Sequence, residues 1–267
     1  GRSPRMGRMK NRWRATLWIV LAGGLALAPA RGADLAAEQQ MALVRRSMPD
    51  VPLELEAALQ VVNPNGKTIK TVRAEARLVP QGDGRTAHYT LLDAFGGTLA
   101  EMTVALADGR AEFAYAVGDP PQPAELPDLF GPIEGSVISW MELSFSYFWW
   151  PNPKIVGTEK VARRWDCQII EIPCPPEYGA GWSYVRLWVA PAYNAVVRGE
   201  AWLDGRACKR FEVKSVKKLR QIYMIGDLEV KDLRSGARAR LKVGRMKMVS
   251  PDYSPEELEE FNAPISW

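Results

Sequence analysis

The sequence of 267 residues is long enough for one large all-β domain or two small ones, and its composition, 47% hydrophobic and 25% charged, is that of a globular protein. A formal net charge of +4 would suit a nucleic-acid-binding protein, but seven of the 35 basic residues precede Asp34, the first acidic residue. Without those seven, acidic residues outnumber basic ones, so the sequence does not favour binding to nucleic acid.

The first 32 residues have the pattern of a secretory signal peptide. The basic stretch MKNRWR precedes the apolar run ATLWIVLAGGLALAPA, and small residues suited to cleavage lie at Ala28, Ala30 and Gly32. The apolar run is shorter than the roughly 20 residues that a membrane-spanning helix needs. We therefore predict a removable signal at residues 1–32, export, and one mature domain at residues 33–267. An uncleaved N-terminal anchor is the alternative.

Three cysteines, Cys167, Cys174 and Cys208, lie in the predicted mature domain. In an oxidising compartment two of them could pair, and the odd number leaves one thiol free or bonded to another chain. Their spacing matches no metal-binding signature. We expect Cys167 to be a buried free thiol.

The mature domain begins with one amphipathic helix and continues with hairpins. In residues 34–48, Ala37, Met41, Val44 and Met48 recur at helical intervals. From Leu53 the apolar period changes to two, with Gly-containing turns between the segments. Strands are predicted at residues 53–61, 72–78, 88–93, 98–106 and 111–117.

A proline-rich stretch at residues 118–135 interrupts the hairpins, either as a boundary between two domains or as a long loop within one sheet. Further strands are predicted at residues 141–147, 160–172, 183–189, 195–203, 208–217, 221–232 and 238–248, followed by a short acidic helix at 254–261. About eleven strands in adjacent hairpins, with few helices, predict a mainly β (α+β) fold built on a single curved antiparallel sheet.

The sequence contains no catalytic or cofactor-binding motif that we can identify. Nucleophilic catalysis by a Ser–His or Cys–His pair needs a base, and the single histidine, His88, lies within a predicted strand, where we expect a structural role. We therefore predict that the protein is not an enzyme and uses no cofactor and no metal. A pair of carboxylates acting on a glycan is the remaining enzymatic alternative.

Aromatic residues are the most informative side chains of this sequence. Residues 147–150 form an uninterrupted run of four, and Trp182, Tyr184 and Trp188 occupy alternate positions of a later segment. A sheet with large apolar groups on one face must cover them with helices or leave a concave apolar cavity. We predict a ligand-binding cavity lined by Leu143, Phe145, Tyr147, Trp149, Trp182, Tyr184 and Trp188, with Met41 and Val44 from the first helix. We expect Phe148 and Trp150 to pack outside it. The alternative is that helices cover the apolar face completely.

The segments GPIEGSVISWMELSFSYFWWPNPKIVGTEKVARRWDCQIIEI, YVRLWVAPAYNAVVRGEAWLDGRACKRFEV and MIGDLEVKDLRSGARARLKV resemble, in this order, the C-terminal two-thirds of the outer-membrane lipoprotein-sorting, LolA-like family. The resemblance covers residues 134–246, and Ala190 departs from it because the family more often has Asp there. The matching positions are Trp140, Leu143, Gly157, Glu159, Arg164, Cys167, Glu171, Trp202, Asp204, Gly205, Lys209, Phe211, Gly236, Arg238, Arg240, Leu241 and Val243.

This resemblance implies a monomeric periplasmic protein with an unclosed half-barrel and lid helices. Its apolar hollow would receive the acyl chains of lipoproteins or lipids from an inner-membrane donor complex and release them to an outer-membrane acceptor. Residues 34–48 and 130–137 would open and close the hollow. The alternative is a periplasmic scaffolding or stress-sensing module whose concave face binds a protein partner.

Overall fold

The computed structural model describes residues 30–249, apart from residues 108, 180, 220 and 221. The helices are α1 (Ala30–Arg46), α2 (Trp140–Ser144) and the 3-10 helices η1 (Ser146–Phe148) and η2 (Pro176–Tyr178). The strands are β1 (Leu53–Val62), β2 (Thr68–Gln81), β3 (Gly84–Leu92), β4 (Thr98–Ala107), β5 (Arg110–Val117), β6 (Gln122–Ala124), β7 (Lys154–Val161), β8 (Trp165–Pro173), β9 (Tyr184–Ala190), β10 (Ala195–Leu203), β11 (Arg206–Leu219), β12 (Ile222–Asp232) and β13 (Arg238–Met248).

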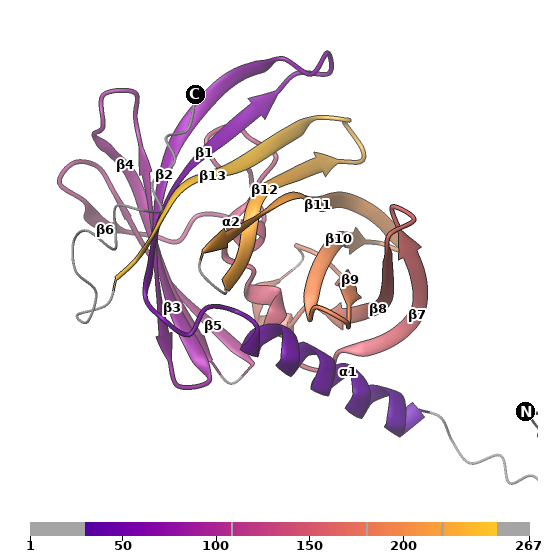
Figure 1. Cartoon of the computed structure of the whole chain (residues 1–267). Coiled ribbons are helices and arrows are strands. Elements are labelled where there is room, and N and C mark those ends of the chain that lie inside the picture. Colours follow the sequence, from indigo (N-terminus) through magenta and orange to yellow (C-terminus); the bar gives the residue numbers. More distant parts are fainter. Residues whose placement is uncertain (1–29, 108, 180, 220–221, 250–267) are drawn as a thin grey trace, which may run out of the picture.

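Within these described residues, the thirteen strands pair in one antiparallel sheet. Its order is β6-β5-β4-β3-β2-β1-β13-β12-β11-β10-β9-β8-β7, and the curved sheet wraps around α2 (Figure 1). The end strands β6 and β7 are not neighbours in this order, so the barrel is not closed. The predicted fold class, a mainly β protein with one curved antiparallel sheet, is confirmed. The predicted C-terminal helix and all but the last three residues of the predicted signal lie outside the described residues.

Period-two alternation determines which face of each strand is buried. In β1, Leu53, Ala57 and Leu59 belong to the hydrophobic core, whereas Glu54, Glu56 and Gln60 occupy the alternate positions on the other face. The same alternation holds in β13, where Ala239 and Leu241 are in the core. This pattern is the reason that the strand predictions in this part of the chain are accurate.

The first and last described strands meet in the middle of the sheet. β1 pairs with β13 from Leu53 opposite Met248 to Val62 opposite Arg238. This seam joins an N-terminal meander, β1 to β6, to a C-terminal meander, β7 to β13. The chain between the meanders crosses the concave side, where α2 lies (Figure 1). We call residues 136–150 of this crossing the aromatic insert.

The strand predicted at residues 141–147 is wrong, because the aromatic insert is helical. The backbone N–H of Ser139 donates to Oε2 of Glu142 at 2.6 Å, and the Ser139 hydroxyl contacts the same carboxylate, so the first turn of α2 is capped. Phe145 then adopts a left-handed conformation, with φ of 52°, which separates α2 from η1. Residues 141–147 alternate large apolar side chains with Glu142, Ser144 and Ser146, which is the period of a strand. Nearly all of the insert is buried, so this alternation does not separate a core face from a solvent face.

The single strand predicted at residues 160–172 is also wrong, because a turn divides it into β7 and β8. Ala162 and Arg163 have positive φ angles of 52° and 57°, and the N–H of Arg164 donates to the carbonyl of Val161 at 3.0 Å. Two consecutive left-handed residues suit a tight hairpin with the twist of its strands, and such turns normally contain Gly or Asn. This turn contains neither residue, so no local signal predicts it.

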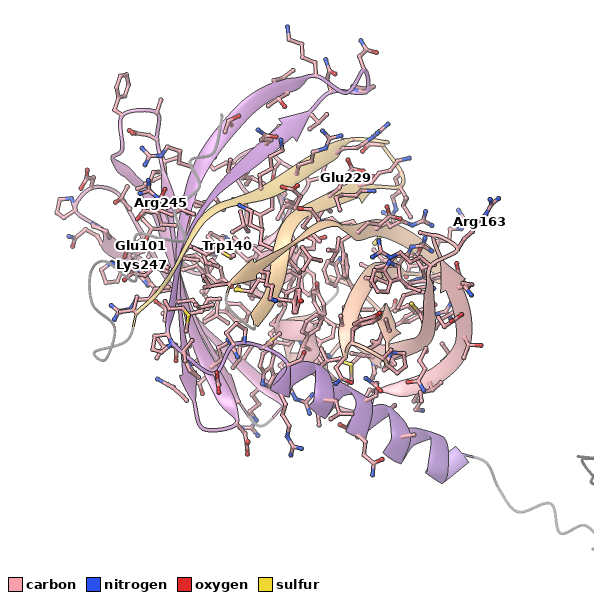
Figure 2. All side chains as sticks on the ribbon, in the orientation of Figure 1. Glu101, Trp140, Arg163, Glu229, Arg245 and Lys247 are labelled. Atoms are coloured by element: carbon pink, nitrogen blue, oxygen red, sulfur yellow. The ribbon has the colours of Figure 1, made fainter. Side chains whose placement is uncertain are left out.

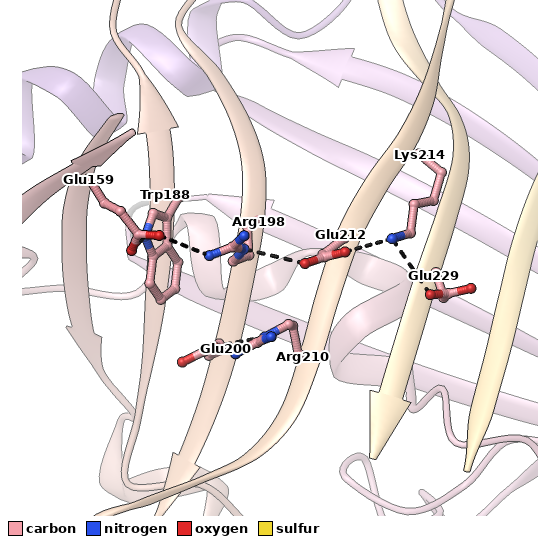
Figure 3. Close-up of polar contacts among 8 residues, drawn as sticks. All are labelled: Glu159, Trp188, Arg198, Glu200, Arg210, Glu212, Lys214 and Glu229. Atoms are coloured by element: carbon pink, nitrogen blue, oxygen red, sulfur yellow. Dashed lines mark hydrogen bonds and ion pairs between the residues drawn. The ribbon is translucent and has the colours of Figure 1, made fainter. Parts of the chain in front are cut away.

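The face of the sheet opposite the core carries a row of charged side chains from β7, β10, β11 and β12 (Figure 3). Arg198 lies 3.3 Å from Glu159 and 3.4 Å from Glu212, and Lys214 lies 2.6 Å from Glu212 and 3.6 Å from Glu229. Such partly exposed pairs contribute little stability, typically below about 1 kcal/mol each. They mark the convex face as the solvated one, so the candidate site must lie on the concave face.

Candidate ligand-binding site

The aromatic insert occupies the concave face and contacts both meanders. The hydroxyl of Tyr89 on β3 donates to the carbonyl of Leu143 at 3.2 Å. On the other side, the ring of Tyr147 packs 5.4 Å from Phe211 of β11, between ring centroids. Trp140, at the start of α2, lies in the interior, whereas Arg163 lies at the periphery (Figure 2). The insert therefore bridges the two halves of the sheet.

The predicted division of the aromatic run into inner and outer residues is wrong. Phe148 and Trp150, predicted to pack outside the cavity, are buried in the same core as Tyr147 and Trp149. The reason is that α2 and η1 replace the predicted strand, so consecutive side chains do not alternate between two faces. Leu143 is also buried in this core, and Phe145 is half-buried against it. Ligand contact by these residues stays a prediction.

Trp182, Tyr184 and Trp188, which we predicted to line the cavity together, do not all lie on one face of the sheet. Trp182 precedes β9 and lies in the main core, 5.0 Å from Phe130 between ring centroids. Tyr184 stacks on Trp202 at 5.5 Å. Trp188 belongs to a second cluster, with Val161, Cys167 and Ala190, on the convex side, where its indole N–H donates to Glu159 at 2.8 Å.

The physical reason lies in β9 itself. Val185, Leu187 and Val189 are fully buried in the main core, so the alternate residues Tyr184 and Trp188 must face the other way. Both keep a polar or cationic neighbour: Arg186 lies over the Tyr184 ring and Arg198 over the Trp188 ring.

Helix α1 covers one end of the core. Met41 and Val44, which helical spacing placed on one face, are both buried in the main core. Three polar contacts hold the helix in place. Nη1 of Arg45 donates to the carbonyl of Phe148 at 2.8 Å. The side chain of Gln40 donates to Oδ1 of Asn194 at 3.2 Å, and the hydroxyl of Ser47 donates to the carbonyl of Asn194 at 3.1 Å. The helix is thus bound directly to the aromatic insert.

One ion pair, between Glu142 and Lys209, lies inside this apolar core. Glu142 is fully buried, and both its carboxylate oxygens lie 3.1 Å from Nζ of Lys209 on β11. Burial, and then the negative charge of Glu142, raise the pKa of Tyr147 well above its usual range. Burial likewise raises the pKa of Tyr89. Both tyrosines are therefore neutral hydroxyls that can donate hydrogen bonds.

A pocket of about 260 Å³ opens beside the insert, on the N-terminal meander. Tyr115 of β5 and Trp140 form one wall, with ring centroids 6.3 Å apart in an edge-to-face arrangement. The remaining lining residues are Leu91, Ala100, Pro127, Asp128, Gly131, Pro132, Ile133 and Glu134. The sequence predictions missed this pocket, although the inward alternation of β3, β4 and β5 could have indicated it. They also missed the pairing of Glu142 with Lys209.

The remaining candidate groups are structural. His88 contacts the Thr103 hydroxyl at 2.9 Å through Nδ1, as expected for a hydrogen-bonded strand residue. Cys167, Cys174 and Cys208 are free thiols. Among the described residues, no group of three metal-ligating side chains could hold an ion. No helix in the same residues is both long and apolar enough to span a membrane.

Comparison with known proteins supports the fold. A family model described only as an uncharacterized protein matches residues 129–257. A search of the curated proteins finds no match. Among solved structures, a putative outer membrane lipoprotein-sorting protein domain from Vibrio parahaemolyticus is similar with a TM-score of 0.68 at 12% identity, covering 84% of this chain and 97% of the other.

Two further structures are similar over comparable lengths. A DUF1329 family protein from Desulfovibrio piger has a TM-score of 0.66 at 13% identity, covering 85% of this chain and 99% of the other. A LolA superfamily protein from Nitrosomonas europaea has a TM-score of 0.59 at 14% identity, covering 85% and 97%. The protein therefore has the LolA-like half-barrel fold that the sequence resemblance predicts.

Proposed function

We propose that this LolA-like half-barrel is a periplasmic carrier without enzymatic activity. It binds the acyl chains of lipoproteins or lipids on its concave face and transfers them toward the outer membrane. One observation carries the proposal. Apolar and aromatic side chains from both meanders converge on the concave face, and a pocket of about 260 Å³ opens there beside Trp140. A signal peptide at residues 1–32 would bring the protein to the periplasm.

Binding would be driven by burial of hydrocarbon. Each methylene transferred from water contributes about 0.8 kcal/mol, so a chain can be held without covalent chemistry. An apolar cavity of roughly 150 Å³ holds one benzene molecule, so the present pocket has room for only part of a long chain. A complete chain therefore requires the aromatic insert to shift.

The contacts of α1 suggest how such a shift would be controlled. Arg45 binds the carbonyl of Phe148, so α1 and the insert would move together. The chain connects the insert to β6 at one end and to β7 at the other, so the insert can be displaced only as a hinged segment. Transfer would then be passive, from an inner-membrane donor complex to an outer-membrane acceptor.

The second candidate function is a periplasmic module that binds a protein partner. The observation that favours it is the filling of the concave face, because Tyr147, Phe148, Trp149 and Trp150 are all buried there. If the insert never moves, little room remains for an acyl chain. The partner would then bind the outer surface rather than the concave face expected from the sequence.

The deciding experiment is purification of the full chain from a periplasm without detergent, followed by mass spectrometry of the extracted lipids and titration with an apolar fluorescent probe. We expect near-stoichiometric acylated ligand. Ala100→Leu, which narrows the pocket, should weaken probe binding about tenfold, whereas Ala114→Leu, on the exposed side of β5, should not. A protein that carries no lipid and binds no probe would overturn the carrier function and favour the protein-binding module.

A further inference from the structure

The hydroxyl of Tyr147 is a buried hydrogen-bond donor for which the described residues supply no hydrogen bond. The residue is fully buried, and its hydroxyl has no partner among the described residues. Nearly all buried polar atoms in native proteins are paired, so each exception calls for a physical explanation. Two residues further along, the indole N–H of Trp149 is a second buried donor without a described partner.

Within the described part of the chain, the surroundings of Tyr147 are mainly aromatic. Its ring lies among five other aromatic rings, at centroid distances of 5.2 to 6.4 Å. These rings belong to Phe145, Phe148, Trp150, Trp182 and Phe211. The carboxylate that affects its pKa, Glu142, accepts hydrogen bonds from Lys209 and Ser139 through Oε2. Its Oε1 lies 3.1 Å from Nζ of Lys209 and forms no hydrogen bond with the described residues, Tyr147 included.

Tyr89 provides an internal comparison. It is buried on the opposite side of the insert, and its hydroxyl donates to the carbonyl of Leu143 at 3.2 Å. The same interior therefore pairs one tyrosine hydroxyl and leaves the other free. A carbonyl oxygen satisfies Tyr89, and the same kind of acceptor would satisfy Tyr147.

We propose that the hydroxyl of Tyr147 donates a hydrogen bond to the carbonyl oxygen of an ester- or amide-linked acyl chain, and so selects acyl chains over alkyl chains. This inference rests on the proposed carrier function. A neutral carbonyl fits better than a free carboxylate, because the Glu142 charge lies close by and would repel a second anion in the dry interior. Discrimination follows because a ligand without the carbonyl leaves the buried donor unpaired.

The test compares two lipids of equal length, 1-monopalmitoylglycerol and 1-O-hexadecylglycerol, which differ by one carbonyl group. Each displaces N-phenyl-1-naphthylamine from the full chain after removal of co-purified lipid. The variants are Tyr147→Phe, which removes the unpaired hydroxyl, and Tyr89→Phe, which removes the paired one. Thermal unfolding of each ligand-free variant is measured in parallel.

We expect the ester to bind about 3- to 10-fold more tightly than the ether, the effect of one hydrogen bond. In Tyr147→Phe this preference should disappear while the melting temperature stays unchanged or rises. In Tyr89→Phe the preference should remain while the melting temperature falls. Equal binding of the two lipids by the unaltered chain, or a preference that survives in Tyr147→Phe, would overturn this inference alone. Failure to bind the probe and both lipids would overturn the carrier function, and the inference with it.

Discussion

Lys209 on β11 and Glu142 on α2 form an ion pair inside the half-barrel, with Nζ 3.1 Å from both carboxylate oxygens. Glu142 is fully buried and the Lys209 side chain is 12% exposed. Removing two charges from water is costly, so such a pair is weak support for stability, but loss of one partner leaves an uncompensated charge. The pair therefore fixes the aromatic insert against the C-terminal meander.

Replacement of one partner should be far more damaging than replacement of both. We expect Lys209→Met to lower the free energy of unfolding by about 3–5 kcal/mol, measured by urea denaturation. Addition of Glu142→Gln should recover most of that loss, because Gln removes the charge and still suits the capping position. The control is Lys214→Met on the same strand, whose side chain is 43% exposed. A Lys209→Met variant no less stable than this control would contradict the prediction.

Gly199 on β10 should not tolerate a side chain. A Cβ atom there would lie 1.9 Å from the Phe211 ring, closer than any real contact. We expect Gly199→Ala to cost about 1–3 kcal/mol through forced repacking, and to change the near-ultraviolet circular dichroism because Phe211 packs on Tyr147. Gly157→Ala is the matched control, since its nearest neighbour, Cδ1 of Ile169, is 3.7 Å away. Equal denaturation midpoints for the two variants would refute this account of Gly199.

The contact between Arg45 and Phe148 should control local opening of the aromatic insert. We expect Arg45→Met to raise amide hydrogen exchange in residues 140–150 about tenfold, the effect of losing one hydrogen bond from a charged donor. Mass spectrometry of peptides from this segment measures the change. Arg46→Met, at an exposed position of the same helix, should leave exchange unchanged. Identical exchange in both variants would show that α1 does not hold the insert.

Cys174 should react slowly despite its partial exposure. Burial raises the pKa of its thiol from 9.0 to about 11, and the thiolate is the reactive form. At about pH 8 we expect iodoacetamide to modify it roughly 100-fold more slowly than in the urea-unfolded chain, as resolved by mass spectrometry of its peptide. Fast labelling of the folded protein would contradict the raised pKa.

The same pKa shift predicts a pH dependence of stability. Because the folded state binds this proton more tightly than the unfolded state, the free energy of unfolding should be unaffected below about pH 9 and should fall between about pH 9 and 11. Urea denaturation across this range measures how steeply the free energy of unfolding falls with pH. Cys174→Ser should remove the contribution of this thiol to that fall. An equally steep fall in Cys174→Ser would assign the pH dependence to other groups.

Sequence reasoning succeeded where one periodicity dominated. Leu53 to Val62 alternates apolar and polar residues, and the predicted strand at 53–61 ends one residue short. Met41 and Val44 lie at helical spacing, and both are buried. In such segments the pattern indicates both the element and its inner face, although Ala58 and Val62 on the other face of β1 are buried too.

It failed where an alternating pattern does not separate core from solvent. Residues 141–147 alternate large apolar residues with Glu142, Ser144 and Ser146, which predicts a strand, yet these polar residues are buried as well. The pair Ser139 and Glu142, a capping box before an apolar run, was the available helix signal. The meeting of Glu142 with Lys209 joins residues 67 positions apart. No local sequence pattern predicts that contact, because it depends on how residues 136–150 pack against β11.

The seam between β1 and β13 has a consequence for how this protein is made. The N-terminal meander can form while the rest of the chain is still being synthesised, but the long edge of β1 stays unpaired until β13 arrives. An open edge of this kind is a template for aggregation. Pairing with β13, the last described strand, removes this central edge, so a chain cut before Arg238 should aggregate more readily than the intact protein.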